Sequence, residues 1–184
     1  RDINGVFLPR LQNADLQSIS ALVKRLCRDA EREQDKAELV FKWIALNIRY
    51  DMETYRGRRR RRSQSAEAVF KDRLGVCEGY ANLFKAMCTL TGVKCAKVCG
   101  LARVGARKEG HAWNAVCLEK KWYPLDVTWA AGHISDSAQF VQCLSMGYWC
   151  CKPEDLIKSH FPQAKKWQLL DKPISKVRWE RMPL

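Results

Sequence analysis

GVCEGYANLFKAMC, residues 75–88, is the stretch that decides how this chain folds. Apolar side chains recur in it at positions 77, 80, 81, 84, 87 and 88, a spacing that predicts a helix from about Cys77 to Gly92. Backbone N–H groups and the positive end of the helix dipole favour an anion at a helix start, and a cysteine thiolate is such an anion. Cys77 is therefore a candidate nucleophile. The alternative is a cysteine that only packs on a helix face.

A cysteine nucleophile needs a base and a group that orients the base, and the chain offers both downstream. His111 begins the alternating motif HAWNAV, and Asp126 lies within the motif LDVTW. Of the two other histidines, His133 lies in a predicted turn, and His160 precedes a Phe-Pro pair, where we expect it to cap or pack. A carboxylate in an apolar strand is costly without a partner, and an imidazole would supply one. We therefore predict His111 as the base and Asp126 as the group that orients it.

These motifs together resemble the transglutaminase-like core, a papain-related fold. The motif VCEGYA around the cysteine, with the later motifs HFP and WQLL, is more narrowly similar to the kyphoscoliosis peptidases. The similarity covers most of the chain. It implies cysteine peptidase or acyl-transfer chemistry, with Cys77, His111 and Asp126 as the catalytic triad.

The order of the predicted elements indicates an α+β fold. Helical patterns cover residues 16–26, 37–48 and 65–70, and strand-like segments cover residues 93–101, 111–118 and 122–127. Helices followed by strands differ from the repeating βαβ order of a parallel sheet. We expect N-terminal helices, with the nucleophile at a helix N-terminus, packed on an antiparallel sheet. This is the papain-like/transglutaminase-like core that the resemblance implies.

The two downstream residues can meet in only one register of the predicted hairpin. If Leu118 pairs with Lys121, His111 and Asp126 lie on the same face of the sheet. If Leu118 pairs with Trp122 instead, Asp126 turns to the other face, because side chains alternate along a strand. The triad therefore requires a hairpin loop with an even number of residues.

Length and composition indicate one domain over residues 1–184. The chain has 47% hydrophobic and 29% charged residues, which is typical of a globular protein. Residues 1–14 show no clear period and are expected to form an N-terminal arm, and residues 173–184 are expected to leave the domain as a tail. No apolar run approaches the roughly 18 residues of a membrane-spanning helix.

The basic run RGRRRRR, residues 56–62, contributes much of the net charge of +13. Because such a run repels itself, we expect an exposed loop. The alternative is an electrostatic patch, and an acidic protein surface is then the expected partner of Arg58, Arg59, Arg60, Arg61 and Arg62. Aromatic residues do not alternate with these arginines, so the run does not predict a specific nucleic-acid site.

The nine cysteines are an odd number and have neither the spacing of a disulfide framework nor a C-x-x-C motif. We therefore expect free thiols, no structural zinc, no cofactor and a reducing, cytoplasmic compartment. Apolar neighbours in the sequence predict that five of them are small buried hydrophobes: Cys88, Cys95, Cys99, Cys117 and Cys143.

Acyl transfer also needs donors for an oxyanion and walls for a substrate. The backbone N–H of Cys77 is one candidate donor, and Gln64 is a second by analogy with the glutamine donors of papain-type enzymes. Trp113 and Trp129 lie close in the sequence to His111 and Asp126. Two interpretations stay open for these tryptophans: they pack in the core and at its rim, or they form a substrate cleft that excludes water.

Two classes of function remain. The resemblance implies an intracellular cysteine peptidase or acyl-transfer enzyme acting on protein substrates, with cytoskeletal proteins as the expected class and a cytoskeleton-associated location. The alternative is a catalytically silent scaffold of the same fold that binds such proteins, although all three triad positions are intact. Peptide N-glycanase shares the core but lacks support here, because its paired-cysteine zinc motif is missing. No acidic cluster supports calcium-dependent crosslinking, and the sequence does not decide between hydrolysis and transfer.

Overall fold

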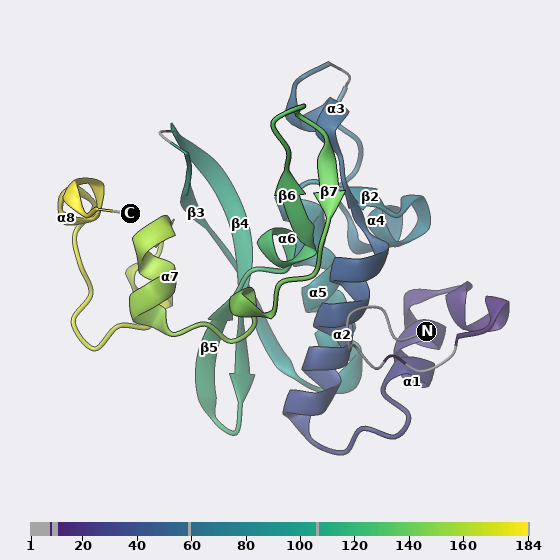
Figure 1. The fold of residues 1–184 in the computed structure, drawn as a ribbon. Coiled ribbons are helices and arrows are strands. Elements are labelled where there is room, and N and C mark those ends of the chain that lie inside the picture. Colours follow the sequence, from purple (N-terminus) through teal and green to yellow (C-terminus); the bar gives the residue numbers. More distant parts are fainter. Residues whose placement is uncertain (1–7, 9–10, 59, 106, 184) are drawn as a thin grey trace.

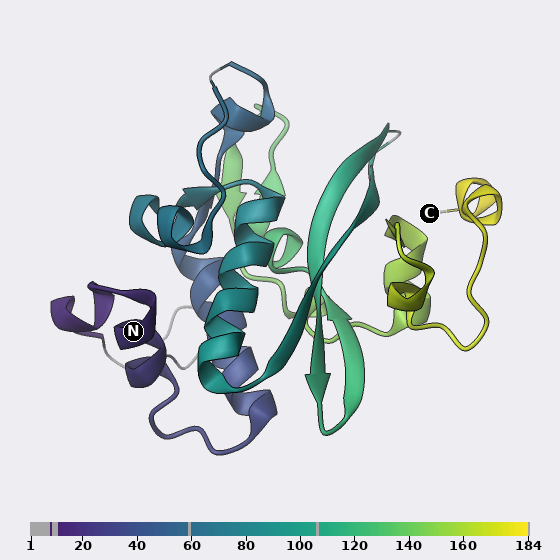
Figure 2. The same ribbon diagram turned by 180° about the vertical axis from the view of Figure 1, so that it is seen from behind.

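The computed structural model describes residues 8, 11–58, 60–105 and 107–183, and these form three layers (Figure 1). A helical layer lies against one face of a four-stranded antiparallel sheet with the strand order β5-β4-β3-β8. Two C-terminal helices lie on the other side of the sheet, and Figure 2 shows the same arrangement from behind. The predicted α+β class is confirmed.

The elements have the following bounds. The first layer contains α1 (Ile19–Leu26), α2 (Glu33–Asn47), α3 (Met52–Tyr55), α4 (Ala66–Asp72), α5 (Cys77–Thr91) and α6 (Val127–Ala131). The sheet contains β3 (Lys94–Val104), β4 (Arg107–Leu118), β5 (Lys121–Leu125) and β8 (His160–Pro162). Two small pairs are β1 (Arg49–Tyr50) with β2 (Leu74–Gly75) and β6 (Gly132–Ile134) with β7 (Phe140–Gln142). The remaining elements are α7 (Pro153–Ser159), α8 (Lys176–Arg181) and the 3₁₀ turns η1 (Asn13–Leu16), η2 (Met146–Tyr148) and η3 (Lys165–Gln168).

The helix α5 begins and ends where the sequence predicts. Its first residue is Cys77, and it ends at Gly92, whose φ of 80° is in the left-handed region that glycine adopts without strain. Its apolar face is fully buried, and the ring of Phe84 meets Phe41 of α2 edge-on with 6.4 Å between centroids. This burial fixes the helix start, and hence Cys77, against the rest of the core.

The β4–β5 hairpin has the register that a Cys-His-Asp triad requires. Leu118 pairs with Lys121. The two loop residues Glu119 and Lys120 both have positive φ values, 49° and 68°, as a tight two-residue hairpin turn requires. The predicted even-numbered loop is confirmed.

The second strand of this hairpin is shorter than predicted. It ends at Leu125, and Asp126 is the N-cap residue of α6. The Asp126 carboxylate accepts hydrogen bonds from the backbone N–H groups of Thr128 (2.8 Å) and Trp129 (3.1 Å). Side-chain capping of this kind starts a helix, so the strand predicted over residues 122–127 ends at Leu125.

The C-terminal segment 173–184 is not the tail that the sequence suggested. Within it, α8 returns to the domain and buries Trp179 completely. The indole Nε1 of Trp179 donates to the backbone oxygen of Ile157 (2.7 Å), and its ring lies 5.3 Å from that of Phe161. The guanidinium of Arg103 in β3 lies 4.7 Å from the Trp179 ring centroid. Trp179 therefore packs α8 onto the sheet, and Arg103 also donates hydrogen bonds to the backbone oxygens of Trp179 and Met182.

This packing predicts a large effect of Trp179→Ala. Removing a fully buried tryptophan should lower the free energy of unfolding by about 3–5 kcal/mol, because transfer and cavity costs add. Val177→Ala on the same helix is the control, since Val177 is 57% exposed and should cost less than about 0.5 kcal/mol. Urea unfolding of the two variants measures the difference. Equal stability of both would show that α8 does not hold the fold together.

The N-terminal arm and the arginine run are described in part. Of the predicted arm, residues 1–7 and 9–10 lie outside the described residues, while Leu8 and Leu11 pack against the core. In the run, residues 57, 58 and 60–62 are exposed, and residue 59 lies outside the description. No helix in the described ranges is long and apolar enough to cross a membrane.

All nine cysteines are free thiols. Cys88 is buried, and Cys95 and Cys117 are half-buried, but Cys99 and Cys143 are exposed, so their predicted burial is wrong. Cys99 shows the reason: its neighbour Val98 in β3 is buried, and successive side chains in a strand point to opposite faces. Apolar neighbours in a sequence therefore do not imply a shared face.

Candidate active site

Cys77 is positioned by a tight turn between β2 and α5. Gln64 is buried beside this turn: its Oε1 accepts from the Val76 backbone N–H (2.9 Å), and its Nε2 donates to the Arg62 backbone oxygen (3.2 Å). A Cβ at Gly79 would lie 2.5 Å from Gln64 Oε1, so a larger residue at position 79 would collide with the Gln64 side chain. Gln64 does not line the cavity that contains Cys77. The expected oxyanion donor is therefore a support for the turn, a correction of the papain analogy.

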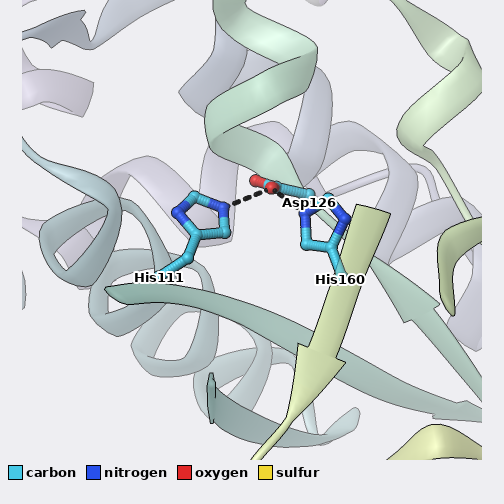
Figure 3. A group of neighbouring side chains, drawn as sticks. All are labelled: His111, Asp126 and His160. Atoms are coloured by element: carbon cyan, nitrogen blue, oxygen red, sulfur yellow. Dashed lines mark hydrogen bonds and ion pairs between the residues drawn. The ribbon is translucent and has the colours of Figure 1, made fainter. Parts of the chain in front are cut away.

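His111 and Asp126 are joined directly, as Figure 3 shows. His111 Nε2 lies 2.6 Å from Asp126 Oδ2, and the Asp126 side chain is fully buried. The hairpin places His111 on β4 and Asp126 just past the end of β5. Oδ1 of the same carboxylate accepts hydrogen bonds from the two capping N–H groups. The backbone of α6 therefore holds the carboxylate in position in addition to the histidines.

A second histidine, whose role the sequence does not predict, shares the same carboxylate. His160 Nε2 lies 2.9 Å from Asp126 Oδ2 (Figure 3). The other ring nitrogen of His160, Nδ1, lies 2.8 Å from Ser159 Oγ. The His160 side chain is fully buried. The pairing of β8 with β3 places His160 opposite Ala102, far along the chain from Asp126. The HFP motif was visible in the sequence, but this long-range strand pairing was not, so capping or packing was the expectation.

The charges of this cluster follow from burial and pairing. Burial lowers the pKa of His111, but the Asp126 charge and hydrogen bonds to Asp126 and Cys77 outweigh it and raise this pKa to about 10. Burial raises the pKa of Asp126, but His111 and His160 outweigh it and hold this pKa well below its ordinary value. Burial keeps the pKa of His160 below its ordinary value. At neutral pH the cluster therefore contains a carboxylate, an imidazolium at His111 and a neutral ring at His160.

Cys77 completes the arrangement on the other side of His111. Since Nε2 is engaged with Asp126, Nδ1 is the ring nitrogen of His111 that is left to meet Cys77, which lines the same cavity and helps to raise the pKa of His111. A cationic imidazole between a carboxylate and a sulfur is the arrangement of a thiolate–imidazolium pair. The structure thus brings the three predicted residues together.

A cavity of about 740 Å³ opens over this group. Cys77, His111 and Trp129 line it, together with Tyr50 and Tyr148. The Trp129 ring lies 5.7 Å from the His111 ring, so this tryptophan is both a cavity wall and a neighbour of the base.

Trp113 does not line the cavity, so the substrate-cleft interpretation of this residue is wrong. It is 2% exposed and packs against the rings of His111 (6.0 Å) and His160 (5.1 Å). Trp113 therefore helps to keep water away from the histidines.

Polar side chains cross the rim of the cavity. Tyr55 in α3 donates a hydrogen bond to Glu109 in β4 (2.8 Å), and both residues line the cavity. Arg61, from the arginine run, also lines it and forms an ion pair with Glu78, the residue after Cys77. Arg61 of the basic run thus borders the site.

His111, Asp126 and His160 are also side chains of the kinds that hold a metal ion, and their candidate ligand atoms lie within 4.8 Å of one another. The two contacts to Asp126, 2.6 and 2.9 Å, are hydrogen-bond distances. Two ligands on one zinc ion, each about 2.0–2.1 Å from it, would lie roughly 3.3 Å apart in a tetrahedral site. The spacing therefore fits a hydrogen-bonded network better than a metal site.

The network predicts that His160 stabilises the Asp126 carboxylate. His160→Ala should lower the free energy of unfolding by about 3 kcal/mol, because it removes a hydrogen bond to a charged group and leaves a cavity. Asp126 has a lowered pKa in the fold, so its contribution is present above its ordinary pKa of 3.8 and is lost as the pH falls further. His160→Ala should shrink this acid-sensitive contribution, whereas His160→Gln, which keeps a donor, should retain most of it. Urea unfolding at several pH values tests this, and identical behaviour of both variants would leave His160 as packing alone.

Comparison with known proteins places this site in a family. The sequence profile described as the transglutaminase-like superfamily matches residues 20–127, more than half of the chain, including Cys77, His111 and Asp126. The chain belongs to the transglutaminase-like superfamily. Kyphoscoliosis peptidase from Mus musculus and that from Homo sapiens are each 31% identical to it over 171 residues, which is 88% of this chain and 26% of the relative. The predicted similarity to the kyphoscoliosis peptidases is confirmed.

A more distant relative is the Caenorhabditis elegans Lim and transglutaminase domain protein ltd-1, 24% identical over 188 residues, which is 92% of this chain and 26% of that protein. The chain thus spans about a quarter of the length of these relatives. Among solved structures, a candidate cysteine protease from Cytophaga hutchinsonii matches 66% of this chain and 40% of its own, with a TM-score of 0.51 and 22% identity. A transglutaminase ("TGase") structure matches 73% of this chain and 35% of its own, with a TM-score of 0.50 and 18% identity. At these identities the structural matches show the fold alone.

Proposed function

We propose that this domain is a cysteine peptidase or acyl-transfer enzyme in which Cys77 is the nucleophile, His111 the base and Asp126 the group that orients the base. The observation that carries this proposal is the position of His111, which is hydrogen-bonded to a buried carboxylate and lines the same cavity as the cysteine at a helix start. The cavity above Cys77 and His111 gives a substrate access to both.

The chemistry follows the usual order for an activated cysteine. In the thiolate–imidazolium pair the Cys77 proton already resides on His111, at Nδ1, and the sulfur attacks a carboxamide or peptide carbonyl carbon. The C–N bond then breaks, the imidazolium gives its proton to the departing amine, and a thioester remains on Cys77. Water or an acceptor amine attacks the thioester and releases the sulfur. Asp126 stabilises the imidazolium in each step, and the Cys77 backbone N–H at the start of α5 is the candidate oxyanion donor.

Protein segments are the proposed substrates, with cytoskeletal proteins as the class implied by the resemblance to kyphoscoliosis peptidases. The arginine run favours acidic side chains near the reacting carbonyl, since Arg61 lines the cavity and Arg58, Arg60 and Arg62 of the same run are exposed. Arg59 belongs to the same proposed patch but lies outside the described residues. Nine free thiols support a reducing compartment, and we propose a cytoplasmic, cytoskeleton-associated location.

A p-nitrophenyl ester tests the proposed chemistry without a known substrate. We expect a burst of nitrophenolate equal to the enzyme concentration and a thioester on Cys77 in the mass spectrum, because acylation precedes deacylation. Cys99→Ala is the matched control: it removes an exposed thiol and should leave the burst intact, whereas Cys77→Ala should abolish it. A burst that survives Cys77→Ala, or its absence in the unmodified protein, would favour the silent scaffold.

A further inference from the structure

A second cavity, of about 870 Å³, lies between the start of α1, α4 and the outer side of α5. Figure 2 shows α1 and α4 against α5, and none of the residues that line this cavity lines the Cys77 cavity. Its walls are mixed: Ile19, Phe70 and Leu90 contribute apolar surface, and Lys71, Arg73 and Lys85 contribute positive charge. The catalytic proposal uses none of these groups.

Arg73 is the unusual residue of this cavity. It follows the last residue of α4 with a φ of 53°, a left-handed conformation in which glycine or asparagine is the usual residue. Its guanidinium lies 4.2 Å from the Phe70 ring centroid and 4.7 Å from that of Trp43. Its Nη1 atom is buried and has no hydrogen-bond acceptor within the described residues. Burial also lowers the pKa of Arg73, as expected for a cation without a counter-charge.

Positive side chains outnumber negative ones in the cavity around Arg73. Lys71 and Lys85 form no ion pair in the described part of the chain, and Glu67 is the single acidic residue in the lining. By contrast, nearby Arg62 is paired with Asp72 at 3.0 Å. The cavity therefore holds three cations against one anion, around an apolar wall. An acidic group would supply the counter-charge that Arg73 lacks.

We propose that this cavity is a docking site for an acidic protein segment, with a carboxylate on Arg73 and an apolar side chain between Ile19, Phe70 and Leu90. A hollow site fits a peptide better than a lipid bilayer, because a bilayer is contacted by protruding apolar side chains. Here Ile19 is 8% exposed and Phe70 7%, so they form the inner wall, and Leu90 alone of the three, 51% exposed, stands at the rim. This site is independent of the chemistry at Cys77.

Two capped, dye-labelled peptides test the proposal: one in which leucines are spaced by glutamates, and the same peptide with every glutamate replaced by glutamine. Titration by fluorescence anisotropy with the Cys77→Ala protein separates docking from catalysis. We expect the acidic peptide to bind at least tenfold more tightly, since a hydrogen-bonded charge pair is worth about a factor of ten or more. In ¹⁵N NMR spectra the shifted amides should be those of residues 18–21, 70–73 and 82–90.

Charge variants locate the site. Arg73→Gln should weaken binding of the acidic peptide about tenfold, and Lys85→Glu, which leaves the aromatic stack untouched, about fivefold. Lys172→Glu, an exposed site outside the cavity with the same change in net charge, should have an effect of less than about twofold. Equal binding of the two peptides, equal effects of Lys85→Glu and Lys172→Glu, or shifts confined to the Cys77 cavity would overturn the proposal. So would binding to anionic phosphatidylserine vesicles without binding to the acidic peptide.

Discussion

Replacing Asp126 with asparagine is expected to lower the rate of acyl transfer by about 10⁴-fold, the scale found when the acid of a Ser-His-Asp triad is changed in this way. Asp126 Oδ2 accepts from two histidines and Oδ1 from two backbone N–H groups, so the carboxylate has no position for a donor. An asparagine amide would present N–H groups to one of these donors. His111 would then lose both its orientation and the charge that stabilises its imidazolium.

The same substitution should also destabilise the fold by about 3–5 kcal/mol, because it leaves buried donors without their charged partner. Burst kinetics with a p-nitrophenyl ester and urea unfolding measure the two effects. Asp155→Asn is the control, since Asp155 forms an exposed pair with Lys158 and should change neither quantity by much. A variant Asp126→Asn with near-normal acylation would remove Asp126 from the catalytic unit.

Replacing His111 with glutamine should lower acylation by about 10³-fold, since general-base catalysis contributes about 10²–10⁴. The variant also tests the ionisation of His111. The pKa of His111 is raised from 6.5 to about 10, so the folded protein holds a proton that the unfolded chain releases. The stabilisation from this proton is complete below pH 6.5 and is lost as the pH rises to about 10.

Stability of the unmodified protein should therefore fall between pH 6.5 and about 10, and His111→Gln should remove most of this decline. Urea midpoints at intervals across this range show it directly. Activity should fall over the upper end of the same range, because a neutral His111 has no proton for the leaving amine. An unchanged pH profile of stability in His111→Gln would mean that the imidazolium does not form in the fold.

The part of the site that could be predicted from the sequence depends on local rules. Helical spacing and Gly92 gave the bounds of α5, and hence the position of Cys77. Strand alternation, with the two-residue turn before Lys121, required His111 and Asp126 to share a face, and the register is the one expected. Each of these inferences involves residues that are close in the sequence or joined by one tight turn.

The part that could not be predicted depends on long-range packing. His160 reaches Asp126 because β8 pairs with β3, and no periodicity in the sequence encodes that partner. Trp179 anchors α8 because its indole is buried against residues that lie far from it in the sequence. Gln64 is expected, by analogy with papain-type enzymes, to be an oxyanion donor. Its carboxamide instead forms hydrogen bonds within the turn before Cys77.

The most direct test of the site is the order in which the cysteines react with limiting iodoacetamide at pH 6, followed by peptide mapping. An ordinary thiol, with a pKa near 8.5, is less than about 1% ionised at this pH. If His111 and Asp126 hold Cys77 as a thiolate, Cys77 should be alkylated well before the exposed Cys99 and Cys143, and His111→Gln should abolish this lead. Alkylation of Cys99 and Cys143 first, with Cys77 equally slow in both proteins, would contradict a catalytic Cys77–His111–Asp126 unit.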